Sequence, residues 1–262
     1  MNRTALVTRT ALVTRTALVT GASSGIGRGV AVALAAAGHR LALSGRNRTE
    51  LERTAEMCGS DPLVVAADVT STAAVDELFT AVESAIGPVE ILIANAGIAR
   101  SAPLVKTTDA HWQEVMEVNL NGPFRCLRRA VPAMTEAGWG RIVVMGSVAS
   151  RIGAPYIAAY VASKHGVLGL VRAAAAELVE TGITVNAVCP AYVDTPLTDA
   201  SIARVVARTG RSEQDAREYF HAQQPIGRMI TVDEVVAAVM FCVDNAALTG
   251  QGINVDGGAV QS

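Results

Sequence analysis

Short apolar runs rich in β-branched residues alternate with longer segments of helical period along most of this 262-residue chain. The first apolar run, at 15–20, leads directly into a glycine-rich turn. Regular alternation of this kind predicts a parallel sheet with right-handed crossovers and helices on both faces. The further expected strands are Arg40–Ser44, Leu63–Ala67, Val89–Ala94, Arg141–Gly146, Thr184–Cys189 and Gly252–Val255, and the expected helices lie near 25–37, 48–58, 71–86, 108–137, 158–181 and 231–245.

The pattern predicts a single α/β domain, a Rossmann-like, doubly wound parallel sheet, because no linker interrupts it. The segment 190–226 breaks the rhythm with Pro190, Pro196 and Pro225 around a polar, helical stretch. An insertion of this length between a strand and the last helix is typical of a lid or binding loop. Ligands of such sheets bind beyond the carboxyl ends of the strands, where this insertion emerges.

The N-terminus repeats Arg-Thr-Ala-Leu-Val-Thr in tandem at 3–8, 9–14 and 15–20. Three copies cannot build a β-helix, and only the third joins the glycine-rich turn. We therefore expect the domain to span 15–262 and residues 1–14 to be an appendage without function.

Composition narrows the class of partner. Half of the residues are hydrophobic and the net charge is −2, so no general field attracts nucleic acid or an anionic membrane. The apolar runs end well before the ~18 residues that a membrane span needs. The four cysteines and four histidines show no metal-ligand spacing, which predicts no metal site, and the cysteines suggest core thiols in a reducing, cytoplasmic compartment. Small-molecule ligands are the expected partners.

The glycine-rich turn carries the first candidate chemistry. Its glycines allow a tight backbone close to a pyrophosphate, while free N–H groups and the helix dipole favour negative charge. The alternative is an ordinary glycine-rich turn, and the spacing is neither Gly-x-Gly-x-x-Gly nor a Walker loop. The candidate cofactor residues here are Gly21, Ser23, Ser24, Gly25, Ile26 and Gly27.

The second strand ends at Gly45-Arg46, about where an acidic residue would hold an adenosine ribose. A guanidinium suits a 2′-phosphate, so Arg46 favours NADP(H), with NAD(H) still possible. Arg48 could share the phosphate. The alternative is a solvated arginine.

Ser147 follows a strand, and Tyr160 and Lys164 open the helical segment after it. Residues four apart share a helix face, so the ammonium is expected to stand beside the phenol and lower its pKa from ~10. The phenol would then serve as an acid/base, and Ser147 would bind a carbonyl oxygen. Singly, each residue also fits a structural role, such as a packed tyrosine or a surface lysine.

Taken together, these motifs resemble the short-chain dehydrogenases/reductases, from about Thr14 to the C-terminus. Two departures are Ala94, where the family often has Asn, and Ala191, where it often has Gly. The matching pieces, in family order, are Thr20-Gly21…Gly25-Ile26-Gly27, Asp68-Val69, Asn95-Ala96-Gly97, Asn119, Ser147, Tyr160…Lys164, Asn186…Pro190 and Asp256-Gly257-Gly258.

The resemblance implies a role for each matching residue. Tyr160 would exchange the proton, Ser147 would orient the substrate, Lys164 would bind the nicotinamide ribose, and Asn119 would hold a water that extends a proton relay. Asp68 and Val69 would bracket the adenine, Asn95, Ala96 and Gly97 would pass close to its ribose, and Pro190, Val193 and Thr195 would line the nicotinamide. A homotetramer is also implied, with 108–137 and 158–181 forming much of one interface.

The expected activity is NADP(H)-dependent interconversion of a ketone and a secondary alcohol, an oxidoreductase reaction on CH–OH/C=O. The stretches Gly182–Pro190 and Pro225–Arg228 resemble those of polyketide and 3-oxoacyl ketoreductases, so a 3-oxoacyl thioester or polyketide-like 3-oxo compound is one candidate substrate. Two alternatives stay open: an NAD-dependent secondary-alcohol or 3-hydroxyacyl dehydrogenase, and a cofactor-sensing protein without turnover. Five arginines flank the expected mouth, as substrate ligands or as a solvated face: Arg100, Arg151, Arg204, Arg208 and Arg211.

Overall fold

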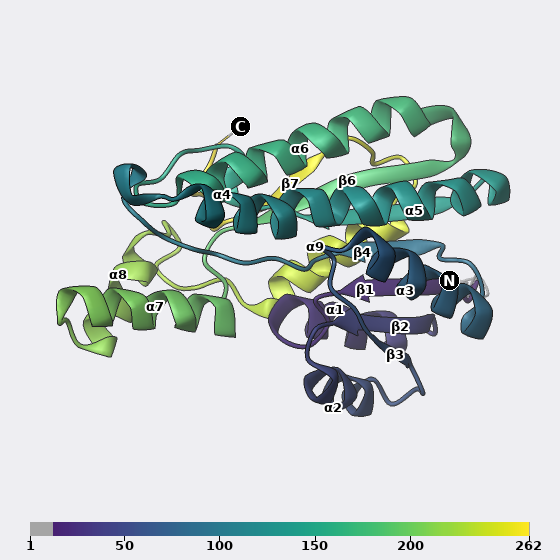
Figure 1. The fold of residues 1–262 in the computed structure, drawn as a ribbon, viewed down its shortest axis with the longest axis horizontal. Helices are drawn as coiled ribbons and strands as arrows, with labels where there is room; N and C mark the ends of the chain where they lie inside the picture. Colours follow the sequence, from purple (N-terminus) through teal and green to yellow (C-terminus); the bar gives the residue numbers. More distant parts are fainter. Residues whose placement is uncertain (1–12, 262) are drawn as a thin grey trace, which may run out of the picture.

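The computed structural model describes residues 13–261 and contains a seven-stranded parallel sheet in the order β3-β2-β1-β4-β5-β6-β7 (Figure 1). The expected doubly wound α/β fold is confirmed. Residues 1–12 of the expected appendage lie outside the described residues. The strands are β1 (Thr16–Thr20), β2 (Arg40–Gly45), β3 (Leu63–Ala66), β4 (Ile91–Ala94), β5 (Gly140–Met145), β6 (Ile183–Pro190) and β7 (Gly252–Val255).

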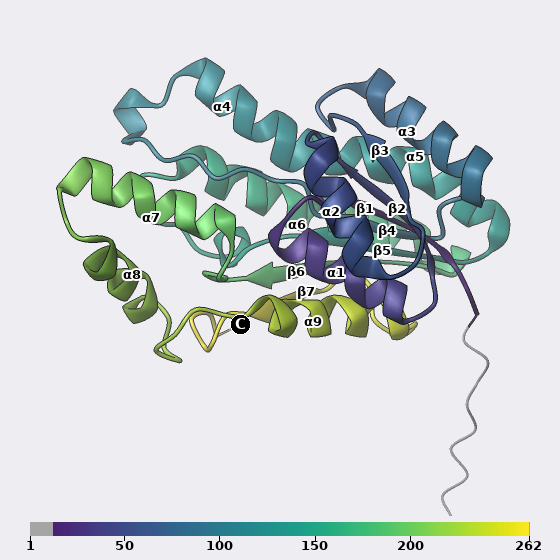
Figure 2. The ribbon, with the colours of Figure 1, turned by 90° about the horizontal axis from the view of Figure 1, so that it is seen from below.

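Helices cover both faces of the sheet, as Figure 2 shows in a view turned from that of Figure 1. The side chains of β1 alternate between the two resulting cores: Leu18 packs with Phe79 on one face, and Val19 packs with Leu34 on the other. All five residues of β1 are buried, as expected for the centre of a parallel sheet. The helices are α1 (Gly25–Ala36), α2 (Arg48–Cys58), α3 (Thr72–Ile86), α4 (Asp109–Met116), α5 (Gly122–Ala137), α6 (Ala158–Leu178), α7 (Pro196–Thr209), α8 (Glu213–Ala222) and α9 (Val232–Asp244).

The expected helix near 108–137 is interrupted. A π-helical turn at Glu117–Asn121 separates α4 from α5. Asn119 lies within this turn and is fully buried, with its side chain hydrogen-bonded to the main chain of Ile98. Single π turns are common at functional sites, and this one turns an asparagine toward the loop after β4.

The insertion at 190–226 forms the helix pair α7 and α8, which projects from the sheet (Figures 1 and 2). Pro196 occupies the first turn of α7, where its missing N–H has no helical partner to lose. A small separate core of Ile202, Ala216, Phe220 and Met229 holds the pair together. The insertion therefore folds as a unit of its own on the body of the domain.

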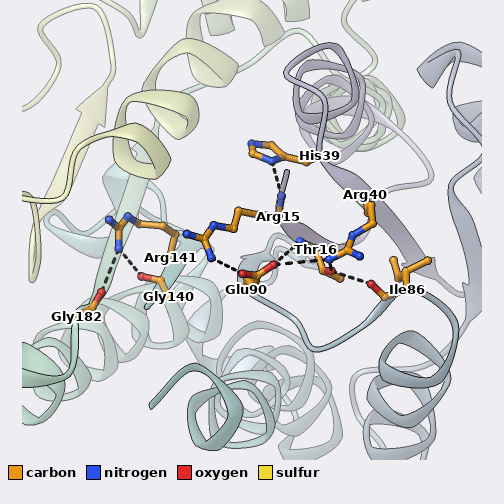
Figure 3. Close-up of polar contacts among 9 residues, drawn as sticks. All are labelled: Arg15, Thr16, His39, Arg40, Ile86, Glu90, Gly140, Arg141 and Gly182. Carbon is orange, nitrogen blue, oxygen red and sulfur yellow. Dashed lines mark hydrogen bonds and ion pairs between the residues drawn. The ribbon is translucent and has the colours of Figure 1, made fainter. Parts of the chain in front are cut away.

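The third repeat copy is anchored at the end of the sheet opposite the strand carboxyl ends (Figure 3). Arg15 forms an ion pair with Glu90 over 2.5 Å, and Glu90 also accepts a hydrogen bond from the main-chain N–H of Thr16. The Arg15 guanidinium also stacks 4.1 Å from the ring centre of Trp139. These contacts fix where β1 begins.

Candidate active site

A cavity of about 260 Å³ opens at the carboxyl ends of the strands. The loops after β1 to β6 all contribute to it, as expected for a doubly wound sheet. Every residue predicted to bind the cofactor lines this cavity except Gly27, and so do three of the four predicted catalytic residues. The lining includes Gly21, Ser23, Ser24, Gly25, Ile26, Arg46, Asp68, Val69, Asn95, Ala96, Gly97, Ser147, Tyr160, Lys164, Pro190, Val193 and Thr195.

The first turn of α1 faces this cavity without a side-chain cap. Ser24 occupies the N-cap position in an extended conformation, its side chain makes no capping hydrogen bond, and the first turn holds no acidic residue. The N–H groups at this end therefore fit the pyrophosphate of a dinucleotide. Gly27 has a different role: a Cβ there would lie 2.2 Å from the carbonyl oxygen of Gly21, so it permits close packing of helix and loop.

Arg46 and Asp68 lie at the end of the cavity formed by β2 and β3. The carboxylate of Asp68 accepts the main-chain N–H of Thr70 over 2.9 Å, which fixes its orientation. Arg48 is turned to its own helix and pairs with Glu52 at 3.6 Å. Arg46 follows Gly45 at this end of the cavity, and its expected contact with the 2′-phosphate of an adenosine ribose stays a prediction.

Asn95 links the loops after β1 and β4. Its amide donates to the carbonyl oxygens of Thr20 and Gly21, each over 3.1 Å. On the other side of the cavity, Val193 bridges to Ile230, and the hydroxyl of Thr198 donates to the Val193 carbonyl over 2.6 Å. Asn95 and the Val193–Ile230 bridge thus join segments far apart in the sequence, and Thr198 adds a local hydrogen bond.

Ser147 directly follows β5 and begins a short 3-10 turn, Val148–Ser150. It forms a capping box with Ser150: the Ser147 side chain accepts from the Ala149 N–H over 3.1 Å, and Ser150 Oγ accepts from the Ser147 N–H over 3.2 Å. Both serines are buried. The box orients the Ser147 hydroxyl in the wall of the cavity.

Tyr160 and Lys164 lie one turn apart at the start of α6, and both reach the cavity. The Lys164 ammonium donates to the carbonyl oxygen of Met145, at the end of β5, over 2.7 Å. Burial lowers the pKa of Lys164 to about 8. The lysine is therefore anchored to the sheet close to the phenol.

The sequence predicts a lowered pKa for Tyr160, but in this structure the net shift of its pKa is upward. Burial raises the pKa of Tyr160, a hydrogen bond with the Ser147 side chain opposes the rise, and Tyr192 adds to it. Removing the phenolate from water outweighs the stabilisation that its neighbours supply. The phenol is consequently protonated at neutral pH.

Asn119 does not line the cavity but lies behind it. Its amide is engaged at both ends, accepting from the Ile98 N–H over 2.8 Å and donating to the Ile98 carbonyl over 3.0 Å and to Ser163 Oγ over 3.2 Å. A Cβ on Gly97 would lie 3.4 Å from Asn119 Oδ1 and 3.8 Å from Lys164 Nζ, so the loop passes between these two side chains. A water relay at Asn119 stays a prediction.

Sequence reasoning missed Tyr192 as a neighbour of the site. Its ring packs edge-on against Phe220 of α8, with 4.7 Å between ring centres, and its charge influences the pKa of Tyr160. Its position two residues after Pro190 was the available signal. It joins α8 of the insertion to the segment whose Ala191 and Val193 line the cavity.

Of the five arginines expected at the mouth, Arg151 binds a neighbouring strand: it donates to Asn254 Oδ1 over 2.8 Å and to the Gly252 carbonyl over 2.6 Å, which links the loop after β5 to β7.

Among residues 13–261, no group of three or more His, Cys, Asp or Glu is arranged to hold a metal ion. Within the same range, no helix is both long and apolar enough to cross a membrane.

Comparison with known proteins agrees with this geometry. Residues 21–260 match a family described as Enoyl-(Acyl carrier protein) reductase. A putative ketoacyl reductase of Streptomyces coelicolor is 38% identical over 247 residues, 91% of this chain and 94% of that protein. A D-beta-hydroxybutyrate dehydrogenase of Rhizobium meliloti is 34% identical over 266 residues, 98% of each chain.

Solved structures show the same fold. A single-substitution variant of actinorhodin polyketide ketoreductase, solved with NADPH, superimposes with a TM-score of 0.90 at 37% identity, covering 95% of this chain and 98% of that one. Levodione reductase gives 0.89 at 32% identity, covering 93% and 96%.

Proposed function

Since this chain belongs to the short-chain dehydrogenase/reductase family, and is thus an NAD(P)-dependent oxidoreductase acting on CH–OH and C=O groups, we propose that it reduces the ketone of a 3-oxo compound with NADPH. The observation that carries the proposal is the pair of hydroxyls from Ser147 and Tyr160 in the cavity wall, the second held protonated by burial. A protonated phenol beside a developing alkoxide is a proton donor, which suits reduction.

Three residues of the cavity wall have distinct roles in the proposed reaction. Ser147 and Tyr160 donate hydrogen bonds to the carbonyl oxygen and stabilise the negative charge that develops there. Tyr160 then transfers its phenolic proton to that oxygen. Lys164, fixed to the Met145 carbonyl, presents positive charge to the phenolate that remains. When bound, the nicotinamide cofactor supplies the hydride that adds to the carbonyl carbon.

Arg46 supports NADPH as the coenzyme. It lines the end of the cavity after β2, where Gly45 precedes it, and its guanidinium can bind a phosphate in a bidentate manner. The similar polyketide ketoreductase was solved with NADPH. The role of Arg46 is part of the proposal.

The test is a spectrophotometric assay of NADPH oxidation with 3-oxo esters, 3-oxoacyl thioesters, simple ketones and quinones, repeated with NADH. We expect turnover of at least one 3-oxo compound and a preference for NADPH of about tenfold or more, the size of one lost charge-assisted contact. A tenfold preference for NADH would contradict the coenzyme assignment. Absence of turnover with every carbonyl would contradict the proposed reduction.

The similarity to D-beta-hydroxybutyrate dehydrogenases favours a second candidate, oxidation of a 3-hydroxy acid with NAD. The phenol would then have to act as a base, which requires its deprotonated form. Assays of 3-hydroxybutyrate with NAD and of acetoacetate with NADPH and NADH distinguish this candidate from the first.

We also propose a homotetramer in the cytoplasm. Phe124 on α5 and Trp112 on α4 leave large apolar side chains partly exposed, which supports burial in an interface on these helices. The four cysteines are free thiols, which supports a reducing compartment. Light scattering on the purified protein tests the first statement, and fractionation of the native cell tests the second.

A further inference from the structure

The insertion leaves the domain at residues 192–194, after β6, and rejoins it at residues 228–230, before α9; we call these segments its two roots. The roots lie side by side: the Ile230 N–H donates to the Tyr192 carbonyl over 2.9 Å, and the Asp194 N–H donates to the Ile230 carbonyl over 3.0 Å. Between them the chain forms α7 and α8, which share a core of their own and project from the sheet (Figure 2). The roots therefore join a separately packed unit to the body of the domain.

Gln224 connects the two roots through its side chain. It follows α8 and is 2% exposed. Its Nε2 donates to the Tyr192 carbonyl over 3.0 Å and to the Arg228 carbonyl over 2.8 Å. A primary amide has two N–H donors, so each root receives one of them.

The second root is fixed to the body of the domain. Arg228 donates to both carboxylate oxygens of Glu234 over 2.9 and 2.7 Å, and Glu234 also closes the capping box at the start of α9. A Cβ on Gly257 would lie 2.5 Å from Ile226 Cγ2, so the turn after β7 packs closely against the turn that follows Gln224. Gln224 thus links the first root to a segment that is itself anchored.

The first root continues into the cavity wall. Val193 and Thr195 line the cavity, and the Val193 carbonyl accepts from the Thr198 hydroxyl over 2.6 Å. A Cβ on Gly25 would lie 3.2 Å from Thr195 Cγ2, so this wall lies against the glycine-rich turn. A displacement of the first root would therefore move the wall on the coenzyme side of the cavity.

The Oε1 atom of Gln224 is buried and has no hydrogen-bond donor among the described residues. A buried acceptor without a donor lowers stability, and an apolar side chain of similar length would avoid this loss. The two hydrogen bonds that the amide donates explain Gln224 better than a gain in stability does.

We propose that Gln224 is a positioning residue for the coenzyme: it holds the two roots together and so keeps Val193 and Thr195 in the wall where the nicotinamide is expected. The inference rests on the proposed reduction with NADPH and adds to it a residue that does not line the cavity. Without the two hydrogen bonds, part of the free energy of coenzyme binding is spent on ordering the roots, so binding weakens. With saturating coenzyme the wall is ordered again, and kcat should stay near its original value.

The main test is Gln224→Met, which keeps the length of the side chain and removes both donors. We expect the dissociation constant of NADPH, measured by fluorescence titration, to rise about tenfold, as for the loss of one or two buried hydrogen bonds. With saturating NADPH, kcat should stay within about twofold, a change smaller than one such bond. The free energy of unfolding should change little, because the unpaired oxygen is removed as well.

Gln224→Asn separates positioning from packing. It keeps an amide, one methylene shorter, that can serve one of the two carbonyls, but it leaves a gap in a buried region. We expect this variant to be less stable than Gln224→Met and yet to bind NADPH more tightly. A packing role alone predicts the same order for stability and for binding.

Limited trypsin digestion reports on the insertion without any ligand, since α7 and α8 contain Arg204, Arg208 and Arg217. Cleavage at these arginines under native conditions should be about tenfold faster in Gln224→Met, because it follows the population of the opened insertion. NADPH should slow it. The control Thr16→Val removes the buried hydrogen bond from Thr16 to the Ile86 carbonyl at the opposite end of the sheet (Figure 3), and should lower stability alone.

Any of four outcomes would overturn the inference: unchanged NADPH binding in Gln224→Met, weaker binding in Gln224→Asn than in Gln224→Met, unchanged cleavage of the insertion, or an equal loss of binding in Thr16→Val. Each leaves ketone reduction by the unaltered protein intact. If the unaltered protein bound no NADPH, the proposed coenzyme would be wrong instead, and the digestion would still show whether Gln224 holds the insertion.

Discussion

Lys164 Nζ lies 5.7 Å from the centre of the Tyr160 ring, while its hydrogen bond is made to the main chain of β5. The cation is thus close enough to act on the phenol electrostatically but is positioned by the sheet. Burial acts on both groups in opposite directions: it lowers the pKa of the lysine and raises that of the tyrosine. At neutral pH the favoured pair is therefore an ammonium beside a neutral phenol.

This pairing predicts the pH dependence of reduction. Lys164 has a pKa of about 8, so raising the pH through 8 converts the ammonium to a neutral amine and removes the charge that stabilises the phenolate. We expect kcat/KM for ketone reduction to be constant below pH 7 and to fall above about pH 8. Lys164→Arg should move this fall to higher pH, because a guanidinium stays protonated. An unchanged profile in Lys164→Arg would contradict the assignment.

Tyr160→Phe removes the proton donor while keeping the ring. We expect kcat to fall by about 10²–10⁴-fold, the usual contribution of a general acid, with NADPH binding retained. Tyr156→Phe is the matched control, since Tyr156 is exposed four residues earlier and does not line the cavity. Fluorescence titration of NADPH and steady-state kinetics measure the two properties. Turnover near the original rate in Tyr160→Phe would show that another group supplies the proton.

Ser150 positions Ser147 without lining the cavity. Ser150→Ala removes the acceptor of the buried Ser147 N–H, so we expect a loss of about 1 kcal/mol of stability, as for other caps, and a separate fall in kcat. Ser150→Thr keeps the hydroxyl and should restore kcat. Ser71→Ala removes a similar cap from α3 at a residue that does not line the cavity, and should lower stability alone. Equal effects on kcat in both alanine variants would exclude a positioning role.

The elements of the fold could be predicted because their signals are local. β1 coincides with the apolar run that ends at Gly21, and α6 coincides with the segment of helical period that lies after Ser147. The π turn at Glu117–Asn121 could not, because it accompanies the hydrogen bonds between Asn119 and Ile98, which are brought together only by the folded chain. The contact that holds α7 and α8 of the insertion together, the shared core of Ile202 and Phe220, likewise forms only in the folded chain.

The candidate site divides in the same way. Glycines and the Tyr160–Lys164 spacing can be recognised in the sequence because turn geometry and helix periodicity place them. The direction of the Tyr160 pKa shift could not be predicted, since it depends on how completely the fold excludes water. The sequence predicts Arg151 at the mouth, whereas in the structure Arg151 donates to Asn254 of β7. This contact could not be predicted, because only the folded chain brings the two residues together. Tyr192 carries no motif of its own, and its packing against Phe220 of α8 is visible only in the folded chain.

Arg46 should set the choice of coenzyme. Arg46→Ala removes the guanidinium from the end of the cavity, so we expect KM for NADPH to rise about tenfold or more while KM for NADH changes little. Arg48→Ala is the matched control, because Arg48 is paired with Glu52 on α2. Measuring kcat/KM for both coenzymes in the three proteins tests the assignment. Equal losses for NADPH and NADH in Arg46→Ala would show a general binding role and no selectivity for phosphate.

The first two repeat copies should be dispensable, because the contacts that start β1 come from the third. Removing residues 1–14, with a start Met kept before Arg15, should leave the free energy of unfolding within about 0.5 kcal/mol and turnover unchanged. Glu90→Ala should instead cost about 1–3 kcal/mol, since it leaves the Arg15 guanidinium and the Thr16 N–H without their acceptor. Glu52→Ala, which breaks only the exposed pair with Arg48, should have little effect. Denaturant unfolding of the four proteins distinguishes the cases. If the truncated protein lost as much stability as Glu90→Ala, residues 1–14 would belong to the folded domain.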